Sequence, residues 1–157
     1  MSNVLNGYFD ELTVGDRFAT RARTITEADL VFFSGFSGDY SALHTDEEYA
    51  KRGPFGRRIA HGCLTLSVGT GLEFSLMSGS GPEDSIVAFY GMDRVRFVKP
   101  VFIGDTLHVE GEVLALEAKD ETRGVVTIRE EIKNQDGTTV AVLDKRTLRI
   151  VKAQSAG

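Results

Sequence analysis

The chain has 157 residues, of which 41% are hydrophobic and 26% charged. This composition is typical of a globular protein and excludes a disordered one, and the length favours a single domain over residues 1–157, with 153–157 as a frayed tail. The net charge of −5 argues against general binding to nucleic acid through its phosphates.

The sequence also argues against secretion, a membrane span and a metal site. Asp10, Glu11 and Asp16 interrupt the stretch where a signal peptide would need an apolar run. No segment has the roughly 18 uninterrupted apolar residues of a membrane-spanning helix. The three histidines lie far apart in the sequence, and the single Cys63 falls on a helix that we expect to be buried. We therefore expect a cytoplasmic protein with no metal and no cofactor.

The first elements lead towards a polar loop. After an entry segment over residues 8–15, residues 17–24 read as a strand. Thr26 and Asp29 have the spacing of a capping box, which predicts a helix running to about Phe36. We expect the phenylalanines of this helix to lie in the core; they are Phe32, Phe33 and Phe36.

The loop that follows carries the candidate chemistry. Asp39 and His44 are separated by four residues with neither helical nor strand periodicity, so a shaped loop can bring both side chains to one point. A carboxylate and an imidazole that share one water can act as an acid/base pair near neutral pH. Taken alone, Asp39 could instead stabilise a turn and His44 could cap the next helix, and both alternatives stay open.

A short helix is predicted after this loop. Thr45 and Glu48 again have capping-box spacing, so the helix should start at Thr45 and run to about Arg52. Residues 53–56 read Gly-Pro-Phe-Gly and should end it.

Residues 60–77 form the least polar helical pattern of the chain. Two apolar stripes leave only a narrow polar strip of Thr65, Gly69 and Glu73, which predicts a helix buried on most of its surface. The N–H groups in the first turn of a helix have no acceptor within it. Because His61-Gly62 stands at this start, the unshielded N–H of Gly62 could stabilise negative charge on a carbonyl oxygen.

The second half of the chain alternates as strands. After a loop at residues 78–82, short strands are expected at 86–92 and 94–98, and longer ones follow around 107–115, 126–132 and 140–150. Tight turns are expected at residues 120–124 and 134–137. The predicted class is α+β, with an antiparallel sheet packed against the long buried helix.

Four blocks of this chain resemble the MaoC-like dehydratases, the family of (R)-specific enoyl-CoA hydratases with the hot dog fold, in which a sheet wraps around a central helix. The blocks cover nearly the whole chain in family order: YFDELTVGD at 8–16, RTITEADLVFFSGFSGD at 23–39, LHTDEEYAKRGPFGRRIAHG at 43–62 and RFVKPVFIGDTL at 96–107.

The resemblance implies a reaction and a site. In the family, the residues matching Asp39 and His44 hold the water that adds across a trans-2-enoyl thioester to give the (R)-3-hydroxy product, and the glycine matching Gly62 donates its N–H to the thioester carbonyl. It also implies an acyl-CoA or acyl-carrier substrate and a homodimer or higher oligomer with continuous sheets. We further expect the substrate to be contacted by Ser67, Thr70, Phe55, Ile59 and His61, with His61 orienting the loop.

Two departures from the family pattern stand out. The loop reads Ser41-Ala42-Leu43-His44 where the family commonly has Asn-Pro-Leu-His, and loss of the proline should loosen it. A serine common in the central helix is Thr70 here. Two alternatives to a hydratase therefore stay open: a thioesterase of the same fold, and a non-catalytic subunit that binds acyl thioesters.

Overall fold

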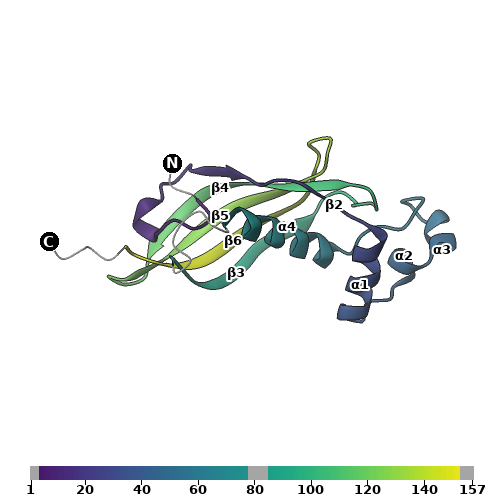
Figure 1. The fold of residues 1–157 in the computed structure, drawn as a ribbon, viewed down its shortest axis with the longest axis horizontal. Coiled ribbons are helices and arrows are strands. Elements are labelled where there is room, and N and C mark those ends of the chain that lie inside the picture. The colour runs from purple at the N-terminus through teal and green to yellow at the C-terminus, as the bar shows by residue number, and fades with distance from the viewer. Residues whose placement is uncertain (1–3, 78–84, 153–157) are drawn as a thin grey trace.

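The protein is an antiparallel sheet curved around one long helix, as seen in a computed structural model that describes residues 4–77 and 85–152 (Figure 1). The sheet order is β1-β4-β5-β6-β3, and a short strand β2 also pairs with β4. The long strands are β3 (Ile86–Phe97), β4 (Thr106–Ala118), β5 (Arg123–Lys133) and β6 (Thr139–Ile150). The predicted α+β class is confirmed. The loop expected at 78–82 and the tail at 153–157 lie outside the described residues.

The short turns of the sheet are where the sequence places them, but two strand predictions are wrong. The expected strand at 17–24 is split into β1 (Arg17–Ala19) and β2 (Arg23–Thr24), because the hydroxyl of Thr20 accepts the N–H of Val109 at 3.0 Å in place of a backbone carbonyl. The two short strands expected around Gly91 are one strand, β3, since register shifts absorb the irregular residues without ending the pairing to β6.

The helix α4 (Gly62–Met77) lies on the concave face of the sheet, and its faces are not those predicted. The polar strip of Thr65, Gly69 and Glu73 is buried. A side chain at Gly69 would come within 2.8 Å of Ile132, so glycine lets the sheet approach, while Glu73 pairs with buried Lys145. Two residues expected to be buried lie on the outer side instead: Phe74 is 63% exposed and Cys63 is exposed, which corrects the expectation that Cys63 is buried.

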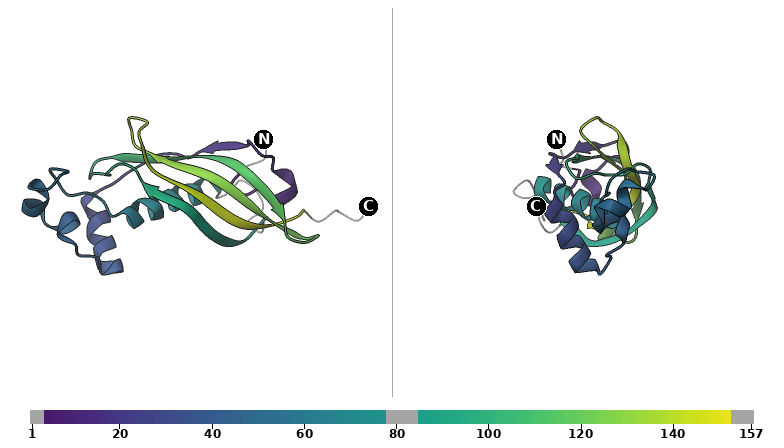
Figure 2. Two further views of the ribbon diagram at one scale, coloured as in Figure 1. Left: turned by 180° about the vertical axis from the view of Figure 1, so that it is seen from behind. Right: turned by 90° about the vertical axis from the view of Figure 1, so that its right-hand side faces the viewer.

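Three short helices, α1 (Glu27–Ser37), α2 (Ala42–Thr45) and α3 (Glu47–Lys51), gather beyond one end of the sheet (Figures 1 and 2). A one-turn 3-10 helix, η1 (Phe9–Glu11), packs against β5. The capping box of Thr26 and Asp29 opens α1 as predicted. Phe32 and Phe36, however, are 74% and 79% exposed and stack on each other, so the expectation that they lie in the core is wrong; only Phe33 packs against it.

The segment after α1 is more regular than the sequence suggests. His44 belongs to the helical turn α2, where a loop was expected. The predicted cap, Thr45, is the last residue of α2, and Asp46 caps α3 by accepting the N–H of Tyr49 at 2.9 Å. The prediction failed because Thr45 and Asp46 are both good caps, and Thr45 instead bonds back to the carbonyls of Tyr40 and Ser41. Among the described helices, none is long and apolar enough to cross a bilayer.

Candidate active site at the start of the central helix

Three polar side chains meet between the small helices and the start of α4. One carboxylate oxygen of Asp39 and one ring nitrogen each of His44 and His61 all lie within 4.8 Å of one another. Gly38, in the left-handed conformation at φ 77°, ends α1 and turns the chain into Asp39. The fold therefore brings Asp39 and His44 together with His61, which lies 17 positions beyond His44 in the sequence.

The ring of His44 is fixed by one backbone contact. Its Nδ1 lies 2.7 Å from the carbonyl oxygen of Ile59. Because a carbonyl can only accept, Nδ1 carries the proton, and Nε2 of the neutral ring keeps its lone pair. His44 is thus oriented to accept a proton through Nε2, and this contact replaces the alternative in which it caps the next helix.

His61 supports both neighbours. Its Nε2 lies 3.1 Å from the backbone oxygen of Asp39 and 3.3 Å from the hydroxyl of Ser34, and its ring stacks on that of His44 with centroids 3.8 Å apart. Burial lowers the pKa of His61, so the ring stays neutral. These contacts fit the expected orienting role.

The histidines were expected to be far apart because they are distant in sequence, and that argument is wrong for His44 and His61. The stacking nonetheless disfavours a shared metal ion, since an ion bound to both nitrogens would have to lie in both ring planes, and these are only 29° apart with the rings face to face.

Asp39 stabilises a turn and also faces the histidines, so both roles that the sequence left open for it are compatible with the structure. Its Oδ1 accepts the backbone N–H of Ser41 at 3.1 Å, which stabilises the turn. The side chain is exposed and its carboxylate still faces the histidines. An ionised carboxylate has acceptor capacity for more than one hydrogen bond, so the turn contact does not prevent a second contact to water.

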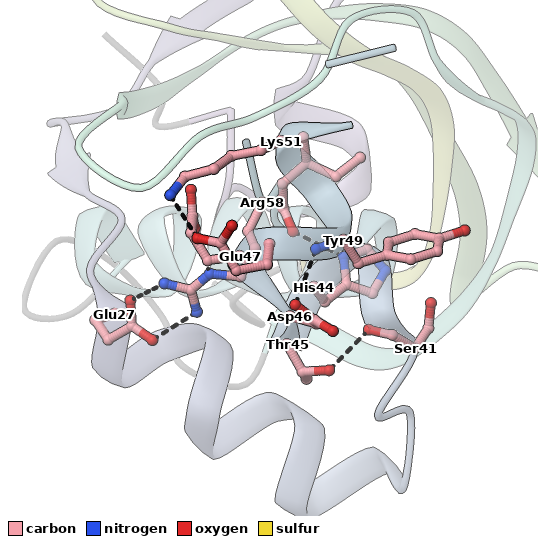
Figure 3. A network of polar contacts seen from close by, with 11 residues as sticks. Glu27, Ser41, His44, Thr45, Asp46, Glu47, Tyr49, Lys51 and Arg58 are labelled. Atoms are coloured by element: carbon pink, nitrogen blue, oxygen red, sulfur yellow. Dashed lines mark hydrogen bonds and ion pairs between the residues drawn. The ribbon is translucent and has the colours of Figure 1, made fainter. Parts of the chain in front are cut away.

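Arg58 holds the segments around this site together, and sequence reasoning did not single it out as a site residue. Its guanidinium makes two bonds of 2.7 Å to the carboxylate of Glu27 in α1 and one of 2.8 Å to Glu47 in α3 (Figure 3). These contacts raise the pKa of Arg58 and lower that of Glu27. The residue next in the chain is Ile59, whose carbonyl contacts Nδ1 of His44, so these ion pairs hold the segment that orients the His44 ring.

A cavity of about 340 Å³ opens beside His44 and reaches the start of α4. Gly62 lines it together with Phe55 and Ile59, two of the residues predicted to contact the substrate. A side chain at Gly62 would come within 2.7 Å of the ring of Phe97, so only glycine leaves room for this ring beside the start of α4. Sequence reasoning missed the lining residues that come from the end of β3 and the segment after it: Phe97, Val98, Lys99, Pro100 and Val101.

Two predicted substrate residues lie elsewhere. The hydroxyl of Ser67 bonds to the carbonyl of Cys63 at 2.8 Å and lines a separate hollow beside Arg21 and Phe32. The hydroxyl of Thr70 bonds to the carbonyl of Leu66 at 3.1 Å and lines another cavity further along α4. Neither belongs to the cavity of His44 in the single chain, and both bond back to the preceding turn as helical serine and threonine residues commonly do.

Comparisons with known proteins show which family the chain resembles along its length. Residues 11–135 match the family described as "MaoC like domain". The chain is 41% identical over 102 residues to Protein MaoC of Klebsiella aerogenes, covering 65% of this chain but only 29% of that protein. It is 32% identical over 126 residues to the (R)-specific enoyl-CoA hydratase of Aeromonas caviae, covering 80% of this chain and 87% of that enzyme.

Solved structures match the fold. A monoamine oxidase regulatory protein from Archaeoglobus fulgius superposes with a TM-score of 0.89 and 38% identity, over 93% of this chain and 95% of that one. A Mycobacterium tuberculosis protein with a double hotdog fold superposes with a TM-score of 0.81 at 20% identity, over 99% of this chain and 47% of that one. The expected hot dog fold is therefore confirmed.

Proposed function

The chain belongs to the MaoC-like domain family, and from that premise we propose that it adds water to trans-2-enoyl thioesters, giving the (R)-3-hydroxyacyl thioester, and catalyses the reverse dehydration. The observation that supports the proposal most directly is that His44 faces the carboxylate of Asp39 and lines one cavity together with Gly62.

Each residue has a distinct role in the proposed reaction. The thioester carbonyl accepts the N–H of Gly62, at the positive end of α4, and this draws electron density from the β-carbon. Nε2 of His44 accepts a proton from a water that Asp39 also holds, and the water oxygen forms a bond to the β-carbon. The electron pair of the double bond moves towards the carbonyl, and the α-carbon then takes the proton back through Asp39. One water is consumed, and its proton and hydroxyl both end on the product.

The tautomer of His44 supports its role as the base. With Nδ1–H donated to the carbonyl of Ile59, an incoming proton at Nε2 creates an imidazolium that stays anchored by the same bond. The carboxylate of Asp39 lies within reach to stabilise this charge.

The test is a panel of trans-2-enoyl-CoA substrates followed by loss of the conjugated thioester absorbance, with the stereochemistry of the product determined. Accumulation of the (R)-3-hydroxyacyl thioester is the expected result. Release of free thiol from saturated acyl-CoA without change in an enoyl substrate would favour a thioesterase. Binding of enoyl-CoA without turnover would favour a non-catalytic subunit.

We propose a homodimer as the working form. β3 is the last strand in the sheet order, and its side chains Phe89 and Tyr90 are 52% and 51% exposed. A second β3 added at this edge would continue the sheet and cover these rings together with Phe74 of α4. Light scattering coupled to size exclusion should give twice the mass of the chain, and a monomer would contradict the proposal. A cytoplasmic location, also proposed, is tested by cell fractionation.

A further inference from the structure

His44 lines two cavities. The cavity of about 340 Å³ described above lies against the start of α4 and the end of β3, and Gly62 belongs to its wall; we call it the thioester cavity. A second cavity of about 240 Å³ lies against α1, whose residues Leu30, Val31 and Ser34 line it; we call it the α1 cavity. The lining residues described for the two cavities have only His44 in common. A molecule in either cavity therefore meets the same imidazole.

The walls of the two cavities differ in polarity. Apart from His44, the polar lining residues of the thioester cavity are Thr65 and Lys99, and the others are apolar or glycine. The α1 cavity is lined mainly by polar residues, which are Glu27, Ser34, Tyr40, Thr45 and Arg58. An apolar wall suits an acyl chain, whereas a wall of hydrogen-bonding groups suits water.

The charges in the wall of the α1 cavity are paired with each other. The guanidinium of Arg58 makes two bonds of 2.7 Å to the carboxylate of Glu27 and one of 2.8 Å to Glu47 (Figure 3). Neither Glu27 nor Arg58 therefore needs an ionic ligand, so the cavity fits a neutral polar one. It has room for several waters, since a water takes up about 30 Å³ in the liquid.

Ser34 supplies a hydrogen-bond donor in this wall. Its side chain is buried, and its Oγ lies 3.3 Å from Nε2 of His61. Because Nε2 also lies 3.1 Å from the backbone oxygen of Asp39, which can only accept, Nε2 carries the proton and the hydroxyl of Ser34 accepts it. The hydroxyl keeps its own proton to donate, and no hydrogen bond among the described residues uses it. A water in the α1 cavity is a suitable acceptor.

We propose that the α1 cavity holds the water that the reaction consumes and supplies it to His44 while the thioester occupies the other cavity. This inference rests on the proposed hydratase function. A bound enoyl thioester displaces water from the apolar thioester cavity, so the reacting water comes from the polar side of the ring. In the reverse dehydration, the released water leaves through the same cavity.

The experiment is a crystal structure of the protein with butyryl-CoA, whose saturated chain cannot add water. The expected result is the thioester carbonyl beside the N–H of Gly62 and ordered waters in the α1 cavity, one of them within hydrogen-bond distance of Oγ of Ser34. An α1 cavity without ordered water, or one filled by the acyl chain, would overturn the inference even if enoyl thioesters are hydrated. Ordered waters at Ser34 in a protein that hydrates no enoyl thioester would instead refute the proposed function alone.

A pair of variants tests the supply of water in turnover. Val31→Trp places an indole at the α1 cavity, so kcat for hydration should fall by about tenfold while KM for the enoyl-CoA changes less than about twofold. Val14→Trp is the matched control, because Val14 is similarly exposed and lines neither cavity, and it should keep the kcat of the unmodified protein. A raised KM with unchanged kcat in Val31→Trp would show that the thioester uses the α1 cavity and would overturn the inference. If Val31→Trp does not fold, the ordered waters in the unmodified protein decide.

Discussion

Two groups of polar side chains lie along α4, and their contacts differ in kind. At the start of the helix, His44 and His61 are each fixed through one nitrogen to a backbone carbonyl, which leaves the other nitrogen with its lone pair. Further along, Lys145 is held between Glu73 and Glu130, so its ammonium is paired within the protein. The first arrangement orients groups for a substrate, whereas the second tethers the helix to the sheet. Loss of a residue should therefore affect catalysis in the first group and stability in the second.

The largest effect is expected from the catalytic pair. Asp39→Asn and His44→Ala should each lower kcat for hydration of crotonyl-CoA by about 10²–10⁴-fold, because each removes a group that moves the proton. The melting temperature should change little for Asp39→Asn, since asparagine can still accept the N–H of Ser41. Lys51→Ala, which removes only an exposed pair with Glu48, serves as the control. Full activity in either variant would break the assignment.

Lys145→Met tests the other side of the comparison. Removing the ammonium leaves two buried carboxylates without their cation, which should lower the free energy of unfolding by about 3–5 kcal/mol. Denaturant titration measures the change. Lys51→Met, which breaks an exposed pair, should cost no more than about 1 kcal/mol. Similar losses for both variants would show that the buried group does not tether the helix.

The sequence describes the candidate site more fully than the surroundings of α4. Asp39, His44 and Gly62 could be singled out as candidates because a polar loop and a helix start carry their proposed chemistry locally, and because four blocks resemble a known family. The stripe of Thr65, Gly69 and Glu73 was misread as the polar side of the helix. Its burial depends on the close approach of Ile132 and on an ion pair with Lys145, 72 positions away, and no local pattern reveals either.

The same limit applies to the parts of the site that come from distant segments. Phe97 and Lys99 line the cavity beside His44 only because the end of β3 lies beside the start of α4. The clamp of Arg58 joins Glu27 and Glu47, which lie 31 and 11 positions away, so charge alone could not mark it as more than a surface arginine. Periodicity predicts which residues share a face, but it does not state which element meets that face.

Gly62→Ala tests whether the substrate must come close to the first N–H group of α4. The added methyl would lie 2.7 Å from the ring of Phe97 and crowd the approach of the thioester carbonyl, so kcat/KM should fall by up to about 100-fold. Combining it with Phe97→Leu should relieve the clash and restore stability. Recovery of the full rate in the double variant would mean that close approach to the N–H of Gly62 is not needed.

The smallest effect is expected from the protonation of His61. Burial lowers its pKa in the folded protein, so below about pH 6.5 the unfolded chain binds a proton that the folded one does not. The free energy of unfolding should therefore fall as the pH falls through this range, with a contribution of at most about 1.4 kcal/mol per pH unit. His61→Gln should remove this contribution from the slope, measured by denaturant titration at several pH values. The same pH dependence of the free energy of unfolding in the unmodified protein and in His61→Gln would contradict this prediction.

The most direct test of the central claim follows the oxygen of the water that Asp39 and His44 are proposed to hold. A trans-2-enoyl-CoA is incubated with the protein in oxygen-18 water, and the products are analysed by mass spectrometry. The account predicts the label in the 3-hydroxyl group of an intact thioester, with formation of this product strongly slowed in Asp39→Asn. Label in a free carboxylate, or a 3-hydroxy product formed equally fast by Asp39→Asn, would contradict it.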